Sequence, residues 1–176
     1  MSSTIEVTDQ GSVLAFTFTD LMRYHGPGSP GGVAHAVKVL ERALPLLAPD
    51  GPAERREIEV RTAFGGPGAR DGVEMVTRAV TEGRYVVDET LARPDLGPAR
   101  ERFVFRLTYR GRSVTLVLRD GYVGEEFVAL VRIAERTVEQ ENRFTVLKQE
   151  MANCLLSSAA SDVYDVCDPA GMDGDG

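Results

Sequence analysis

The stretch Tyr24-His25-Gly26-Pro27-Gly28-Ser29-Pro30-Gly31-Gly32 organises this 176-residue chain. It places one of only two histidines in a Gly/Pro-rich loop, directly before an apolar segment from Val33 to Leu47. Ser29 is a typical N-cap residue and Pro30 a typical first helical residue, because the N–H that proline lacks has no partner in a first turn. Free backbone N–H groups and the helix dipole favour anions at such a helix start. The loop is therefore the first candidate for a functional site.

Two segments have the periodicity of amphipathic helices. In the first, which Pro49-Asp50-Gly51-Pro52 ends, the apolar residues recur at steps of four and three on one face. These are Val33, Val37, Leu40, Leu44 and Leu47, with Lys38, Glu41 and Arg42 expected to face away. The second helix is expected from Ala69 to Glu82, after the loop Gly65-Gly66-Pro67-Gly68 and before Gly83, which is placed to close it in the left-handed conformation. Both helices thus follow a glycine-rich loop.

Alternating apolar and polar residues predict strands between and after these helices. Arg56 to Phe64 reads as a half-buried strand, and the clearest hairpin runs from Phe103 to Leu118 with its turn at Arg110-Gly111. Ser12 to Phe18 and Arg84 to Asp88 are further extended segments, and Glu89 to Arg100 is a polar connection. The order of elements predicts an α+β fold with a mixed sheet.

The C-terminal third is expected to be helical. From Gly124 to about Leu156 the chain has good helix formers and no later glycine or proline, with an irregular apolar pattern around residues 139–142. One long or two broken helices would protrude or pair with a second copy, because a small core cannot cover so long an apolar face. The domain plan is therefore an α+β core over residues 1–122, a helical extension and homodimer contact over 123–160, and a flexible acidic tail over 161–176.

Composition narrows the possible partners. The 27 acidic and 20 basic side chains give a net charge of -7 and a pI near 4.9, which disfavours nucleic acid and anionic membranes. No basic flank with an apolar run opens the chain, and no apolar run approaches the roughly 18 residues of a membrane span. We expect a cytoplasmic protein without membrane contact, in which Cys154 and Cys167 are unpaired thiols.

The candidate site joins the two glycine-rich loops. His25 can act as a base, an acid or a ligand, or can simply hydrogen-bond the loop backbone. Arg70, together with backbone N–H groups, would hold a carboxylate or phosphate; the glycines assigned to that role are Gly31, Gly32, Gly66 and Gly68. Asp71 would orient His25 or act as a base, and Glu74 would assist, although both acids are also what the first turn of any helix prefers.

The remaining polar residues have simpler interpretations. Tyr24 would donate a proton or pack its ring, and packing is the favoured interpretation. His35 projects opposite the apolar stripe, so a solvated or subunit-interface position is expected. Ser29 is explained by helix capping, and Cys154 by an inert apolar setting.

The motifs Tyr24-His25-Gly26-Pro27-Gly28-Ser29-Pro30-Gly31 and Gly68-Ala69-Arg70-Asp71-Gly72 resemble those of the FmdE-like family, which is named after a component of formylmethanofuran dehydrogenase. The family's first motif is an aromatic-His-Gly-His-x-Cys-Pro-Gly start to a helix, and its second is a Cys followed by Asp-Ala. The resemblance covers roughly residues 21–118 and implies an α+β fold similar to the second domain of glyceraldehyde-3-phosphate dehydrogenase. It also implies His and Cys residues associated with metal binding.

The departures from the family decide the expected chemistry. Pro27, Ser29 and Gly68 stand where the family's second His and its two Cys would be, so only His25 remains of a zinc site that needs three or four ligands. We therefore expect no cofactor and a metal-independent enzyme that acts on an anionic small molecule in a biosynthetic pathway. His25, Asp71 and Tyr24 would supply acid/base chemistry of the lyase, isomerase or cyclase type. Two alternatives stay open: a non-catalytic ligand-binding or accessory protein, and a haem or metal protein with His25 as ligand.

Overall fold

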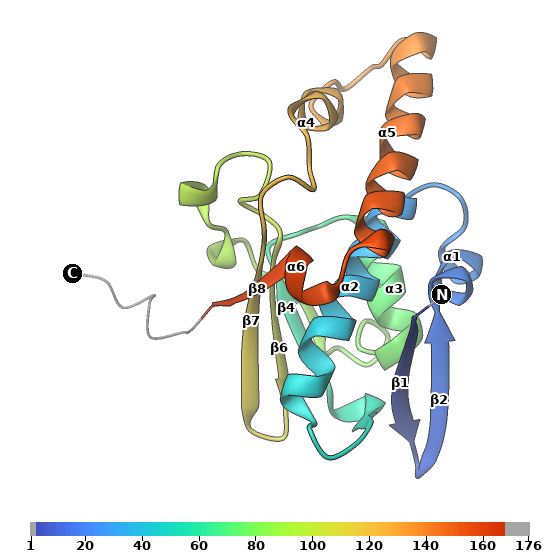
Figure 1. The fold of residues 1–176 in the computed structure, drawn as a ribbon, viewed down its shortest axis with the longest axis vertical. Coiled ribbons are helices and arrows are strands. Elements are labelled where there is room, and N and C mark those ends of the chain that lie inside the picture. Colours follow the sequence, from blue (N-terminus) through green and yellow to red (C-terminus); the bar gives the residue numbers. More distant parts are fainter. Residues whose placement is uncertain (1–2, 168–176) are drawn as a thin grey trace, which may run out of the picture.

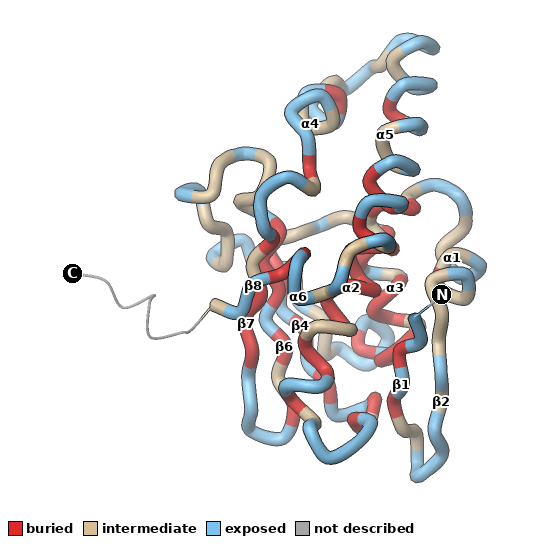
Figure 2. The backbone as a smooth tube through the Cα atoms, viewed as in Figure 1, coloured by how far each residue is buried: buried red, intermediate tan, exposed pale blue. Residues whose placement is uncertain are grey.

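Helix α2 (Pro30–Leu47) lies at the centre of the computed structural model, which describes residues 3–167 (Figure 1). It begins at the proline and ends where the sequence indicated, and its whole apolar stripe is buried. The opposite side is covered as well, because helices α3 (Pro67–Thr77) and α5 (Val138–Ser157) and both sheets pack around it (Figure 2). Lys38 is consequently buried and pairs with Glu41 at 2.9 Å, which corrects its expected outward position.

A small sheet packs against one side of α2. Its order is β2-β1-β3, with β1 (Thr4–Asp9) antiparallel to β2 (Ser12–Thr17) and parallel to the two residues of β3 (Ala53–Glu54). Gln10 and Gly11 both have positive φ, as a two-residue hairpin turn of type I′ requires. The sequence indicated β2 but not β1 or β3.

The larger sheet is mixed, as expected, with the order β5-β4-β6-β7-β8. The bounds of its strands are β4 Glu59–Thr62, β5 Tyr85–Val87, β6 Val104–Tyr109, β7 Arg112–Leu118 and β8 Tyr164–Cys167. β5 is parallel to β4, and the remaining neighbours are antiparallel. The β6–β7 hairpin turns at Arg110-Gly111, as predicted, with both residues at positive φ. Since α3 joins β4 to β5, these three elements form a βαβ unit.

Shorter helices fill the connections, and two boundaries differ from the prediction. Helix α1 (Phe18–His25) starts at a capping box made by Thr17 and Asp20. Helix α3 ends at Thr77 rather than Glu82, because Arg78 takes the left-handed conformation with φ of 61°. The first residues of the predicted strand 56–64 instead belong to a 3₁₀ turn at Arg55–Glu57, and two further 3₁₀ turns lie at Glu89–Leu91 and Pro94–Leu96.

The helical extension consists of two helices, α4 (Glu125–Val131) and α5, which form an arm (Figure 1). The break lies at residues 132–137 and not at 139–142, because Thr137 and Gln140 form a capping box that starts α5. The outer part of α5 is mostly exposed (Figure 2), whereas its C-terminal half packs on α2 through Met151, Ala152 and Leu155.

The last described residues return to the larger sheet. Helix α6 (Ala160–Val163) leads into β8, which pairs with β7, and Tyr164 is fully buried. Residues 161–167 are therefore part of the folded core and not of a flexible tail. Residues 168–176 of the expected tail lie outside the described residues. Across 3–167, no helix combines the length and hydrophobicity that a membrane crossing needs.

Candidate functional site

His25 and Asp71 meet where the end of α1 reaches the start of α3. The Nδ1 atom of His25 lies 2.8 Å from Oδ2 of Asp71, across 46 residues of sequence. The imidazole side chain is 9% exposed and the carboxylate 25%, so the contact lies at the edge of the core. The structure thus forms the histidine–carboxylate pair that the sequence suggested.

Glycines bring the helices of this site close together. A Cβ at Gly68 would lie 2.7 Å from the carbonyl oxygen of Ser29, and one at Gly72 would lie 2.7 Å from Cβ of Ala36. Contacts this short are open only to glycine, since real Cβ atoms do not approach other heavy atoms so closely. The two glycine-rich loops therefore do converge, as predicted, and their convergence positions Asp71 beside His25.

The pair fixes which nitrogen of His25 can exchange a proton. A carboxylate that accepts from Nδ1–H holds the neutral imidazole in the tautomer whose Nε2 is unprotonated. Nε2 makes no hydrogen bond to any of residues 3–167, and it is not among the side-chain atoms sealed from solvent. It is therefore a base that an incoming molecule can reach.

Arg70 supplies a positive charge next to this base. Its Nε lies 3.2 Å from Oδ1 of Asp71, so one carboxylate contacts both the imidazole and the guanidinium. The Arg70 side chain is 51% exposed, and no hydrogen bond within the described chain uses its two terminal nitrogens. These donors can bind an anion in a bidentate manner.

Tyr85 is a polar residue of this neighbourhood that the sequence analysis missed. Its hydroxyl is buried and has no hydrogen-bond partner in residues 3–167. Burial raises the pKa of this hydroxyl to about 12, while the charge of Arg70 lowers that pKa and the charge of Asp71 raises it further. The sequence could have indicated this residue. Tyr85 is the first residue of β5, the strand that follows α3 in the βαβ unit, and the helix of such a unit packs on its strands.

Glu74 does not belong to the site. Its carboxylate is buried and accepts hydrogen bonds from the backbone N–H groups of Val80 and Thr81, at 2.7 and 3.0 Å, and from the Thr81 hydroxyl. It holds the turn that follows α3, because the left-handed Arg78 redirects the chain there. The hydrogen bonds of this carboxylate therefore give Glu74 a structural role in place of the expected position beside Arg70 and Asp71.

The glycines that were expected to bind substrate instead allow close contacts between neighbouring parts of the fold. Gly31 faces Met151 of α5, Gly32 faces Gly68, and Gly66 lies against the ring of Phe64. The start of α2 is further covered by Lys148, whose Nζ donates to the carbonyl of Gly28 at 3.0 Å. Ser29 occupies the N-cap position without a side-chain capping bond. The α2 start is therefore packed closely against α5 and the start of α3.

Tyr24 and His35 lie apart from the pair. Tyr24 is 54% exposed and makes no hydrogen bond or ring contact in the described part of the chain, so its expected packing role is not seen. His35, expected at the surface, is fully buried: its Nδ1 lies 2.8 Å from the Tyr164 hydroxyl and its ring centroid 4.5 Å from that of Phe103. Burial lowers its pKa to about 3, so it is neutral. Its Nε2 has no partner among residues 3–167.

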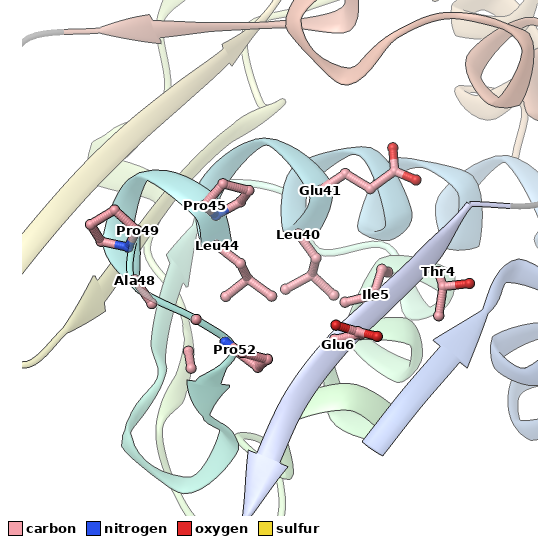
Figure 3. Close-up of a pocket in the computed structure, with 12 residues that line it drawn as sticks. Thr4, Ile5, Glu6, Leu40, Glu41, Leu44, Pro45, Ala48, Pro49 and Pro52 are labelled. Carbon is pink, nitrogen blue, oxygen red and sulfur yellow. The ribbon is translucent and has the colours of Figure 1, made fainter. Parts of the chain in front are cut away.

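Two hollows lie at the other end of α2, away from His25 and Asp71. One, of about 390 Å³, lies between β1 and the C-terminal half of α2 (Figure 3), and the other, of about 430 Å³, lies between the 47–52 segment and the β6–β7 turn. In residues 3–167 no three His, Cys, Asp or Glu side chains gather in a way that would hold a metal ion.

Comparisons with known proteins add no assignment. A scan against protein-family models finds none that matches the chain, and a search of curated proteins finds no similar sequence.

Proposed function

We propose that the protein is an acid/base enzyme for a small anionic molecule, with Nε2 of His25 as the atom that transfers the proton. The observation that carries the proposal is the 2.8 Å contact between His25 Nδ1 and Asp71 Oδ2, combined with the unpartnered Nε2. A carboxylate that accepts from one ring nitrogen of an imidazole fixes its tautomer and its orientation. The arrangement suits proton abstraction and return, as in lyase, isomerase and cyclase reactions.

Neighbouring residues have separate roles in this proposal. Asp71 is the positioning residue for the imidazole, and Arg70 binds the carboxylate or phosphate of the substrate through its free guanidinium nitrogens. The buried hydroxyl of Tyr85, with its raised pKa, stays protonated behind this site. The motif resemblance in residues 21–118 supports an FmdE-like fold for this enzyme, and the order helix, strand, helix, hairpin is consistent with it.

We also propose that two copies associate through the α4–α5 arm. Several apolar side chains on it remain exposed, among them Val131, Val138 and Val146. A second copy would cover them.

The enzymatic proposal is tested by hydrogen–deuterium exchange at carbon in a panel of 2-oxo acids and 2-hydroxy acids, followed by proton NMR. Wild-type protein should exchange the α-proton of at least one member. His25→Asn should lower that rate by about 10²-fold or more, the usual contribution of a general base. Asp71→Asn should lower it less, and Arg70→Gln should raise KM.

Glu139→Gln, which changes an exposed carboxylate on the distant α5, is the matched control and should leave the rate unchanged. Equal rates for wild type and His25→Asn would remove His25 from the chemistry. A complete absence of exchange across the panel, together with no NMR shift of the His25 ring nitrogens, would overturn the assignment of an anion site here.

A further inference from the structure

The hollow between β1 and α2 has the surface of a binding groove. Its floor is formed by Ile5, Leu40 and Leu44, whose side chains point toward one another in Figure 3 and are at most 7% exposed. Pro45, Pro49 and Pro52 flank this floor with rigid apolar rings. We call the hollow of about 390 Å³ the β1–α2 groove.

One wall of the groove is an unpaired strand edge. β3 lies beside only Val7 and Thr8, so no described strand lies along β1 from Thr4 to Glu6 on that side. The two-residue turn makes Asp9 and Ser12 a hydrogen-bonded pair, and such pairs alternate along an antiparallel ladder. The main-chain groups of Thr4 and the N–H of Glu6 therefore point away from β2, toward the groove.

The opposite wall of the groove is α2, and Pro45 interrupts the main-chain hydrogen bonds of this helix. Pro45 lies inside α2 and has no N–H, so it cannot donate the usual helical bond to the carbonyl of Glu41. Both residues line the groove. The carbonyl of Glu41 is thus left without the helical donor that a residue other than proline would supply.

The charge of the groove is entirely negative. Among residues 3–167, the ionisable residues that line it are Glu6 and Glu41. Glu6 is exposed and has no ion pair within residues 3–167, whereas Glu41 contacts Lys38 and the Ser3 hydroxyl. The exposed proline rings, the carboxylates at the rim and the open strand edge favour an extended ligand with alternating apolar and cationic side chains.

From this geometry we infer that the β1–α2 groove binds an extended basic peptide segment of a partner protein, which adds as a strand to Thr4–Glu6. Its apolar side chains rest on the exposed rings of Pro45, Pro49 and Pro52, and its lysine or arginine side chains reach Glu6 and Glu41. Residues 168–176 of the chain itself are the wrong occupant, because they carry Asp168, Asp173 and Asp175 and no basic residue.

The experiment uses the full chain and a fluorescein-labelled octapeptide of alternating lysine and valine, with binding followed by fluorescence anisotropy. We expect saturable binding in the micromolar range, and a shift of the Glu6 backbone amide in the nitrogen–proton NMR spectrum. Glu6→Gln should weaken binding roughly two- to fivefold, as loss of one exposed charge contact does. Glu139→Gln makes the same charge change on α5 and should have no effect.

Two altered peptides separate strand addition from simple charge attraction. N-methylation of alternate peptide bonds keeps the charge but removes main-chain donors, and it should abolish binding. The proposal is overturned if the N-methylated peptide or free spermidine binds as tightly as the parent peptide, if Glu139→Gln weakens binding as much as Glu6→Gln, or if the parent peptide does not bind at all. A glutamate–valine octapeptide should not bind, and equal affinity for it would also overturn the proposal.

Discussion

The two histidines of this chain lie in opposite environments. His25 contacts a carboxylate and leaves Nε2 open to solvent, whereas His35 is sealed among Phe64, Phe103 and Tyr164. The Gly/Pro loop around His25 could be recognised from the sequence, since its glycine and proline content is local. The burial of His35 could not, because it depends on residues up to 129 positions away that cover the polar side of α2.

The buried His35 should make the protein less stable in acid. Its pKa is about 3 in the folded protein and near 6.5 when exposed, so between these values the unfolded chain binds one more proton. Its favourable contribution is complete above pH 6.5 and declines as the pH falls toward 3, with a slope of at most about 1.4 kcal/mol per pH unit.

Urea denaturation at pH 7.5, 5.5 and 4.5 measures this effect. His35→Gln removes the titrating group, so the variant should be less stable than wild type at pH 7.5 and the difference should shrink at lower pH. A difference independent of pH would show that His35 does not titrate on unfolding.

At the scale of elements, the sequence predicts locally encoded features correctly and misses long-range pairings. The β6–β7 hairpin and helix α2 carry their turn, proline and periodicity in contiguous sequence. β1 and β8 are recognisable only through the strands that they pair with. In the site, the pairing of His25 with Asp71 follows from the two loops, whereas Glu74 is misplaced because the sequence puts the end of α3 five residues too late.

The crossing of α2 and α3 depends on Gly68, and we expect Gly68→Ala to destabilise the protein. The added Cβ would meet backbone atoms of Ser29 and Val33, at 2.7 and 3.0 Å, which cannot move as a side chain can. Overpacking of this kind costs about 1–3 kcal/mol of the free energy of unfolding.

Gly65→Ala is the matched control in the same loop, because its Cβ would meet nothing within 4 Å. Chemical denaturation should place it within about 0.5 kcal/mol of wild type. If both variants lose equal stability, close packing at Gly68 is not the cause.

At the scale of the whole molecule, the arm is the part whose position is not accounted for by packing on the core. Its outer half has few buried residues (Figure 2). Phe144 contacts the ring of Phe127 and the cations of Arg136 and Lys148. Val138 is 78% exposed at the start of α5. A helix that long with so little support from its own core is typical of an interface between copies.

We expect wild-type protein to sediment as a dimer in analytical ultracentrifugation and the double variant Val138→Lys, Val146→Lys to sediment as a folded monomer. Charged side chains at an apolar interface are strongly unfavourable, whereas they are neutral on a solvated helix. Asn153→Lys adds a charge at an exposed polar position of α5 and should leave the dimer intact. Wild type that sediments as a monomer would disprove the dimer.

The protein cannot complete its core during synthesis until Tyr164 has been added to the chain. This residue contributes to the last strand of the larger sheet, and its hydroxyl meets His35 in the central helix. The other described core elements all precede this residue in the sequence, so α2 stays incompletely covered until β8 has been made. The core formed by residues 3–167 is therefore complete only after β8 has been made, and truncation before residue 164 leaves His35 without its hydroxyl partner.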